Sequence, residues 1–74
     1  MRIYITHHAR QRMRERGITR TQVEDCLYHY QISRPGDKGK VVYDYTDEQG
    51  YRTSVTATNE NDRWVVVSVW RIQA

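Results

Sequence analysis

The apolar positions follow a helical period between residues 7 and 30 and strand-like alternation after residue 39. The first helical segment is His7–Arg16, which has no Gly, Pro or β-branched residue and places Ala9 and Met13 on one face. Thr6 offers an N-cap, and Gly17 is the kind of residue at which a helix commonly ends. We therefore predict a first helix that packs through Ala9 and Met13.

A second helix follows, and its start signal is stronger. Thr19 and Gln22 have the spacing of a capping box, in which each residue satisfies a backbone N–H of the other. The helical period then predicts a buried stripe made of Val23, Cys26, Leu27 and Tyr30. Segment Gln31–Gly39 contains a Pro-Gly pair and a further glycine, so we predict a loop there.

Short segments rich in Val, Tyr, Thr and Trp account for the remaining residues. At the N-terminus, Arg2–Ile5 alternates and predicts an edge strand. Turn signals separate three further strands, which we expect at Lys40–Thr46, Tyr51–Thr58 and Arg63–Ile72. The turns are expected at Asp47–Gly50 and Asn59–Asp62, and connections this short imply an antiparallel meander.

The last predicted strand is largely apolar on both faces, which is typical of a strand inside a sheet. Strict alternation puts Val65, Val67 and Val69 on one face and Trp64, Val66, Ser68, Trp70 and Ile72 on the other. We expect the valine face to meet the helices. The chain as a whole is predicted to be one α+β domain, residues 1–74, with two short N-terminal helices packed on an antiparallel β-meander in the order β-α-α-β-β-β.

Composition narrows the class of protein. No apolar run approaches the roughly 20 residues that a membrane-spanning helix needs, so no membrane partner is expected. The single cysteine, Cys26, excludes an intrachain disulfide, which favours a cytoplasmic location. Positive charge is local: residues 1–20 carry six Arg against one Glu, whereas residues 21–74 carry six basic and eight acidic side chains. A basic patch of this kind binds phosphate or an acidic protein surface, or it is simply a solvated helix face.

The basic patch has an ordered pattern. His8, Arg12 and Arg16 follow one another at four-residue spacing beside the predicted packed stripe, and Arg10 lies on a more exposed row. Arginine binds phosphate in a planar, bidentate manner, and histidine is suited to proton transfer near neutral pH. A structural interpretation stays open, in which Arg12 or Arg16 pairs with a sheet carboxylate such as Asp44 and His8 bonds a loop carbonyl.

The other reactive side chains are less informative. Cys26 and His29 lie three residues apart, but a zinc site needs four converging ligands, and His7 and His8 point about 100° apart on a helix. We expect no metal and no cofactor, and Cys26 is interpreted as a small core residue. Aromatic residues on an open sheet surface can stack nucleic-acid bases, although core packing is their commoner role. Arg71, near the end of the last strand, is expected to face solvent, an ion pair or a phosphate.

The motif H-A-x-x-R-M-x-x-R-G-I, which begins at His8 and ends at Ile18, resembles the opening of a small bacterial family of domains of unknown function. The Val/Tyr strand, the turn exit from Gly50 to Arg52 and the Val-rich last strand resemble the rest of that family's pattern. The order of elements also resembles the RelE/BrnT-like toxins, compact α+β ribonucleases that an antitoxin holds inactive. This second resemblance implies metal-independent RNA cleavage by basic and imidazole or phenol groups.

The sequence thus predicts a RelE/BrnT-like RNA-binding domain, with a metal-independent ribonuclease toxin as its catalytic form. The catalytic candidates are His8 and Arg12, and the candidates for nucleic-acid binding are Arg12, Arg16, Arg10 and Arg71. RNA and an antitoxin or other acidic protein are the expected partners. The alternative is a non-catalytic interaction module whose basic helix docks an acidic protein or nucleic acid, or a regulatory or inhibitory protein of mobile-element origin.

Overall fold

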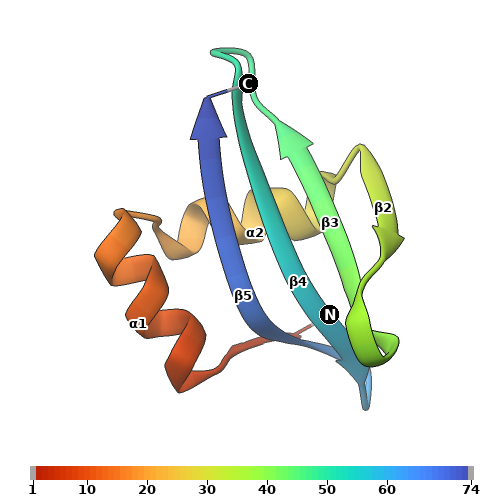
Figure 1. Ribbon diagram of the computed structural model, residues 1–74. Coiled ribbons are helices and arrows are strands. Elements are labelled where there is room, and N and C mark those ends of the chain that lie inside the picture. The colour runs from red at the N-terminus through yellow and green to blue at the C-terminus, as the bar shows by residue number, and fades with distance from the viewer. Residues whose placement is uncertain (1, 74) are drawn as a thin grey trace.

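A computed structural model describes residues 2–73. The elements are β1 (Arg2–Ile5), α1 (His7–Arg16), α2 (Arg20–His29), β2 (Ile32–Pro35), the 3₁₀ turn η1 (Asp37–Gly39), β3 (Val41–Thr46), β4 (Tyr51–Glu60) and β5 (Arg63–Gln73). The strands form one sheet in the order β1-β5-β4-β3-β2. Figure 1 looks onto the face of this sheet that no helix covers, with α2 behind the strands. The α+β class is confirmed.

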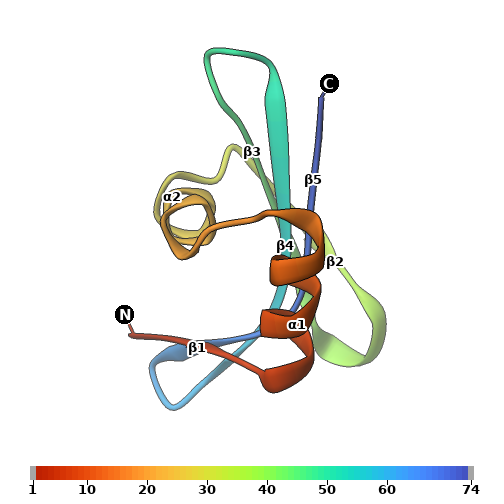
Figure 2. The ribbon, with the colours of Figure 1, turned by 90° about the vertical axis from the view of Figure 1, so that its left-hand side faces the viewer.

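The first helix begins and ends where the sequence predicts. The Thr6 hydroxyl accepts a hydrogen bond from the Ala9 backbone N–H at 3.2 Å. Gly17 adopts a left-handed conformation, φ 67°, which closes the C-terminus at low steric cost. Ala9 and Met13 are buried, and the helix packs against β5. Figure 2 shows that α1 lies beside the edge of the sheet, whereas α2 lies over one face.

The second helix has the predicted capping box between Thr19 and Gln22. Its buried side chains are Val23, Cys26 and Leu27, which pack on β3 and β4. Tyr30 does not continue this stripe and is 45% exposed. The helix ends at His29, and the extended backbone of Tyr30 (ψ 143°) turns the side chain out of the helical phase.

The predicted loop Gln31–Gly39 contains a strand that the sequence analysis missed. Residues Ile32–Pro35 pair antiparallel with β3, and only the turn η1 separates the two strands. The side-chain amide of Gln31 extends this pairing, because it accepts from the Thr46 backbone N–H at 3.0 Å and donates to the Thr46 carbonyl at 3.2 Å. Pro35 ends the strand at the sheet edge, where a residue without an N–H is tolerated.

The sheet is mixed because β1 pairs with β5 in parallel. As predicted, β1 is an edge strand and β5 has neighbours on both sides. A tight turn joins β4 to β5, and its two central residues, Asn61 and Asp62, have φ values of 53° and 59°. Left-handed residues of this kind match the twist of a two-residue hairpin.

An irregularity in β5 corrects the predicted valine face. Thr56 pairs with Ser68, but the next residue, Ala57, pairs with Val66, so Val67 is an extra residue in a β-bulge. The bulge reverses the alternation: Trp64 and Val66 face the helices before it, and Val69 faces them after it. The expectation that Val65, Val67 and Val69 share the core face is therefore wrong for the first two. The same bulge separates Trp64, which is buried, from Trp70, which is exposed.

Candidate nucleic-acid interface

The helix-free face of the sheet carries basic, hydroxyl and exposed apolar side chains together. Cross-strand partners point to the same face, so the pairs Ile32–Asp44, Asp44–Ser54 and Ser54–Trp70 form one row across four strands. The neighbouring rows contribute Arg34, Val42, Thr56, Thr46, Arg52 and Ile72. Ile32 is 58% exposed and Trp70 is 54% exposed. Ile72, two residues from Trp70 on the same face, is 48% exposed, and adjacent exposed apolar side chains of this kind commonly mark a binding surface.

A shallow groove of about 350 Å³ runs across this face. It is lined by Arg34, Val42, Arg52, Ser54, Thr56, Trp70 and Ile72. The lining thus combines two guanidinium groups, two hydroxyls and an indole. We call this set of seven residues the sheet groove.

One buried carboxylate organises the polar part of the sheet groove. Asp44 accepts hydrogen bonds from the Ser54 hydroxyl and from Arg34 Nε, the latter at 3.2 Å. Burial raises the pKa of Asp44, but hydrogen bonds from Ser54 and Arg34 and the positive charge of Arg34 and Arg52 outweigh it, so the pKa is lowered overall. Asp44 is therefore ionised at neutral pH and fixes the position of Arg34.

Arg52 adds a second positive charge close to Asp44. Its Nε is buried and has no hydrogen-bond partner within residues 2–73. Arg34 and Arg52 together exceed the single charge of Asp44, so the sheet groove keeps a net positive charge. An anionic group such as a phosphate would supply acceptors for both guanidinium groups.

Arg16 connects α1 to this face. Its guanidinium stacks on the Trp70 ring at 3.5 Å from the ring centroid, and its Nη1 donates to the Val69 carbonyl at 2.8 Å. Arg16 thus reaches from the helix around the edge of β5 to the indole of the sheet groove. This contact joins the predicted basic row to the helix-free face.

The other predicted site residues of α1 are His8, Arg12 and Arg10, and each has its own surroundings. His8 is exposed in the first turn of α1, and Arg12, one turn further on, forms an ion pair with Glu15 at 2.9 Å. Arg10 turns towards β1, where its Nε donates to the Ile5 carbonyl at 3.2 Å. Neither Arg12 nor Arg16 pairs with Asp44, whose partner is Arg34.

Arg71 lies on the other side of the sheet. It forms an ion pair with Asp47 at 3.1 Å and stacks on the Tyr51 ring. The small hollow that it lines also includes Gln22 and Asp25 of α2. Arg71 therefore lies on the helix-covered face, away from Arg16.

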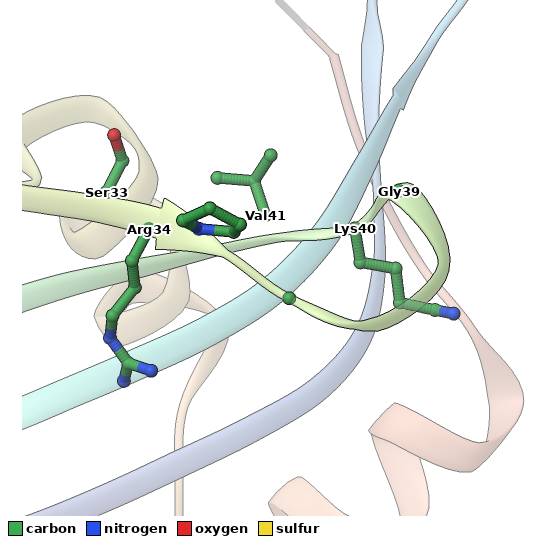
Figure 3. A pocket seen from close by; sticks show the side chains of 7 residues that line it. Ser33, Arg34, Gly39, Lys40 and Val41 are labelled. Atoms are coloured by element: carbon green, nitrogen blue, oxygen red, sulfur yellow. The ribbon is translucent and has the colours of Figure 1, made fainter.

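A second hollow adjoins the sheet groove at the β2–β3 connection. It measures about 560 Å³ and is lined by Ser33, Arg34, Pro35, Gly36, Gly39, Lys40 and Val41. Figure 3 shows that Arg34 and Lys40 extend to one side of this connection, whereas Ser33 and Val41 point to the other. Because Arg34 lines both hollows, Lys40 extends the basic surface beyond the sheet groove.

Sequence reasoning missed Arg34 and Arg52 as site residues and named Trp70 only as one residue on the second face of the last strand. Alternation within β4 could have found part of the site, because it places Arg52, Ser54 and Thr56 on one face. Arg34 was missed because its segment, Gln31–Gly39, was predicted to be a loop.

Cys26 is a core residue, as predicted. Its thiol donates to the Tyr43 and Thr53 carbonyls at 3.2 and 3.4 Å. Burial, with a smaller contribution from the Asp44 carboxylate, raises the pKa of Cys26 from 9.0 to about 12. Such a thiol is a poor nucleophile.

Residues 2–73 contain no group of three or more His, Cys, Asp or Glu side chains placed to hold a metal ion. No helix in the same range is both long and apolar enough to cross a bilayer.

The fold and this face define a small two-layer domain whose sheet is covered by helices on one side and is basic on the other. The chain belongs to the family described as Domain of unknown function (DUF4258), whose model matches residues 5–72. The predicted membership of a family of unknown function is therefore confirmed. No curated protein and no solved structure matches the chain.

Proposed function

We propose that this domain binds single-stranded RNA across the helix-free face of its sheet. The observation that carries the proposal is the stack of Arg16 on Trp70 at the border of a groove that also contains Arg34 and Arg52. Basic residues interleaved with an exposed aromatic ring are the two components that single-strand binders combine. The guanidinium groups bind successive phosphates, and the indole stacks a base.

Three features favour RNA as the ligand. Single strands expose base faces for stacking, whereas a duplex buries them. The Ser54 hydroxyl donates a hydrogen bond to Asp44, so its oxygen is left to accept one, and Thr56 also lines the groove. Hydroxyl groups at this position match the ribose 2′-hydroxyl, which is both donor and acceptor and distinguishes RNA from DNA. The resemblance of the element order to RelE/BrnT-like toxins agrees with this ligand, although it concerns topology alone.

The first test replaces Trp70. We expect Trp70→Ala to weaken binding of a short fluorescent oligouridylate by the roughly 1–3 kcal/mol that one stacked base contributes, as measured by anisotropy. The matched control is Tyr28→Ala, because Tyr28 is similarly exposed, at 52%, but lies on α2 and contacts Trp64 on the helix-covered side. Equal losses in the two variants, or no loss in Trp70→Ala, would contradict the proposal. Weaker binding of the matching deoxyribose strand is the expected sign of 2′-hydroxyl recognition.

Cleavage of the bound RNA is a separate part of the proposal and rests on His8 and Arg12. Both side chains belong to the row that ends at Arg16, and His8 is exposed and accessible to a bound strand. The ion pair between Arg12 and Glu15 is exposed and weak, so a phosphate can replace the carboxylate. In this mechanism His8 accepts the proton of the ribose 2′-hydroxyl as that oxygen bonds to phosphorus, and it returns the proton to the 5′-oxygen as the phosphorus–oxygen bond breaks. The products are a cyclic phosphate and a 5′-hydroxyl, and Arg12 stabilises the charge that develops on the phosphate.

Cleavage is tested with end-labelled RNA and purified protein. We expect His8→Ala to lower the cleavage rate by about 10²–10⁴ and Arg12→Ala by about 10²–10³, with EDTA having no effect. His7→Ala is the control, since His7 is an exposed neighbour that points elsewhere on the helix. Full activity in folded His8→Ala removes His8 from the mechanism. Binding without cleavage by the unaltered chain leaves the RNA-binding function and ends the ribonuclease hypothesis.

A further inference from the structure

The outer edge of β5 is only partly covered. β1 pairs with β5 at Arg63–Val66 and nowhere else in the described part of the chain. The next covering group is α1, which lies beside the middle of β5 and ends near Val69, where Arg16 donates to the backbone. Figures 1 and 2 show that the last part of β5 extends past the end of this helix.

The direction of the backbone groups along this edge follows from two hydrogen bonds. The Thr6 backbone N–H donates to the Val66 carbonyl at 3.1 Å, and Arg16 donates to the Val69 carbonyl at 2.8 Å. Along a strand, every second residue directs both its N–H and its C=O to the same side. The bulge at Val67 shifts this period by one residue, so that after it Val69, Arg71 and Gln73 direct their backbone groups outward. Apart from the Arg16 contact, these groups have no backbone partner strand within residues 2–73.

An open strand edge of this kind accepts an additional strand. The added strand must be a peptide, because its own N–H and C=O groups have to match the two-residue spacing of the edge, and RNA has no such ladder. A second copy of this chain is disfavoured at the same edge, since antiparallel pairing would bring the two arginine-rich helices together. Residues 1–20 alone carry a net charge of +5.

We propose that the outer edge of β5, residues Val69–Gln73, binds an extended acidic segment of a partner protein as an additional strand. The charge beside the edge determines the chemistry of that segment. Arg16 lies on the Trp70 side of this edge, directly beside the Val69 carbonyl. Acidic side chains on the Trp70 side of the added strand pair with Arg16, while the partner's backbone N–H replaces Arg16 at the Val69 carbonyl.

One consequence rests on the proposed function. The added strand and the sheet groove both use Arg16, so the partner draws this guanidinium away from Trp70 and weakens RNA binding. Partner binding itself does not depend on that consequence, and it is measured without RNA.

The test selects ligands for the full chain from a display library of short random peptides. We expect the selected peptides to be rich in Asp and Glu at alternate positions and free of internal proline. Binding should slow hydrogen exchange at the backbone amide of Arg71, as followed by NMR. Methylation of alternate backbone nitrogens of the peptide should abolish binding, whereas methylation of the intervening ones should not. A short oligouridylate should leave the exchange of the Arg71 amide unchanged.

Two substitutions in α1 test which arginine pairs with the acidic side chains of the bound peptide. We expect Arg16→Gln to weaken the selected peptides about fivefold, as for an exposed ion pair, and Arg14→Gln to have little effect. Arg14 is the matched control because it is a neighbouring exposed arginine in the same turn. Selected peptides without acidic residues, or protection at β2 in place of Arg71, overturn the proposal. A gain in exchange protection at Arg71 on adding oligouridylate alone would assign this edge to RNA.

Discussion

The two faces of the sheet use the same strands for different purposes. On the helix-covered face, β4 and β5 present Val55, Ala57, Val66 and Val69, all fully buried. On the helix-free face, the same two strands present Arg52, Ser54 and Thr56 with Trp70 and Ile72. Stability therefore comes mostly from one face and ligand contacts from the other, so substitutions should separate the two properties.

The comparison also shows how β5 serves both faces. The bulge at Val67 lets Trp64 and Val66 fill the core at one end of β5 while Trp70 reaches the open face at the other. Without the extra residue, Val69 and Trp70 would exchange faces. The indole in the sheet groove thus depends on an irregularity several residues away.

The largest effect is expected from the helix-covered face. Leu27 is 1% exposed, and Leu27→Ala should lower the free energy of unfolding by about 2–5 kcal/mol because it leaves a cavity. The matched change on the other face is Ile72→Ala, where the side chain is 48% exposed and the expected loss is below about 1 kcal/mol. Urea unfolding followed by circular dichroism measures both. Similar losses in the two variants would show that the helix-free face carries part of the core.

A smaller effect is expected at Asp44, the buried carboxylate of the helix-free face. The lowered pKa of folded Asp44 means that its ionised form stabilises the protein above the unfolded pKa of about 4. That contribution is lost as the pH falls through the lower folded pKa. Asp44→Asn should therefore cost about 1–3 kcal/mol at neutral pH, and the difference from the unaltered chain should shrink below about pH 4.

The control for this pH dependence is Glu48→Gln, which changes an exposed carboxylate in the turn between β3 and β4. Its unfolding free energy should follow that of the unaltered chain at every pH. If Asp44→Asn follows the unaltered chain in the same way, Asp44 does not hold Arg34 in place, and the assembly of the sheet groove needs another explanation.

The smallest effect concerns the salt dependence of RNA binding. Each phosphate contact contributes a slope of about −0.7 to the logarithm of affinity against the logarithm of salt concentration for single strands. Arg16→Ala should reduce the magnitude of the slope by about that amount. Arg14→Ala, a change of equal charge on the same helix, should reduce it less because the arginine that stacks on the indole is Arg16. Affinity that is indifferent to salt and to both changes favours docking of a protein.

The sequence alone was enough to place the ends of both helices and most of their buried positions, with Tyr30 as the exception. Thr6, Gly17 and the pair Thr19–Gln22 act on backbone groups within a few positions of themselves, so the helix ends could be predicted from neighbouring residues. The four-residue spacing likewise identified Ala9 and Met13 as buried, because it depends only on helix geometry. For β1, β3, β4 and β5, the type of element also followed from short-range signals of this kind, whereas β2 was missed.

Tertiary structure alone decided which surface gathers the basic side chains. Residues Ile32–Pro35 become a strand because β3 is available to pair with them, and this pairing brings Arg34 to Asp44. The bulge at Val67 lets β5 pair with β4 while both ends of β5 fill the core. The alternation of apolar and polar residues along the strand does not reveal this requirement. The contact of Arg16 with Trp70 joins residues 54 positions apart and depends on where α1 lies beside the sheet. Pairing and packing across such separations depend on partners that a local reading of the sequence does not contain.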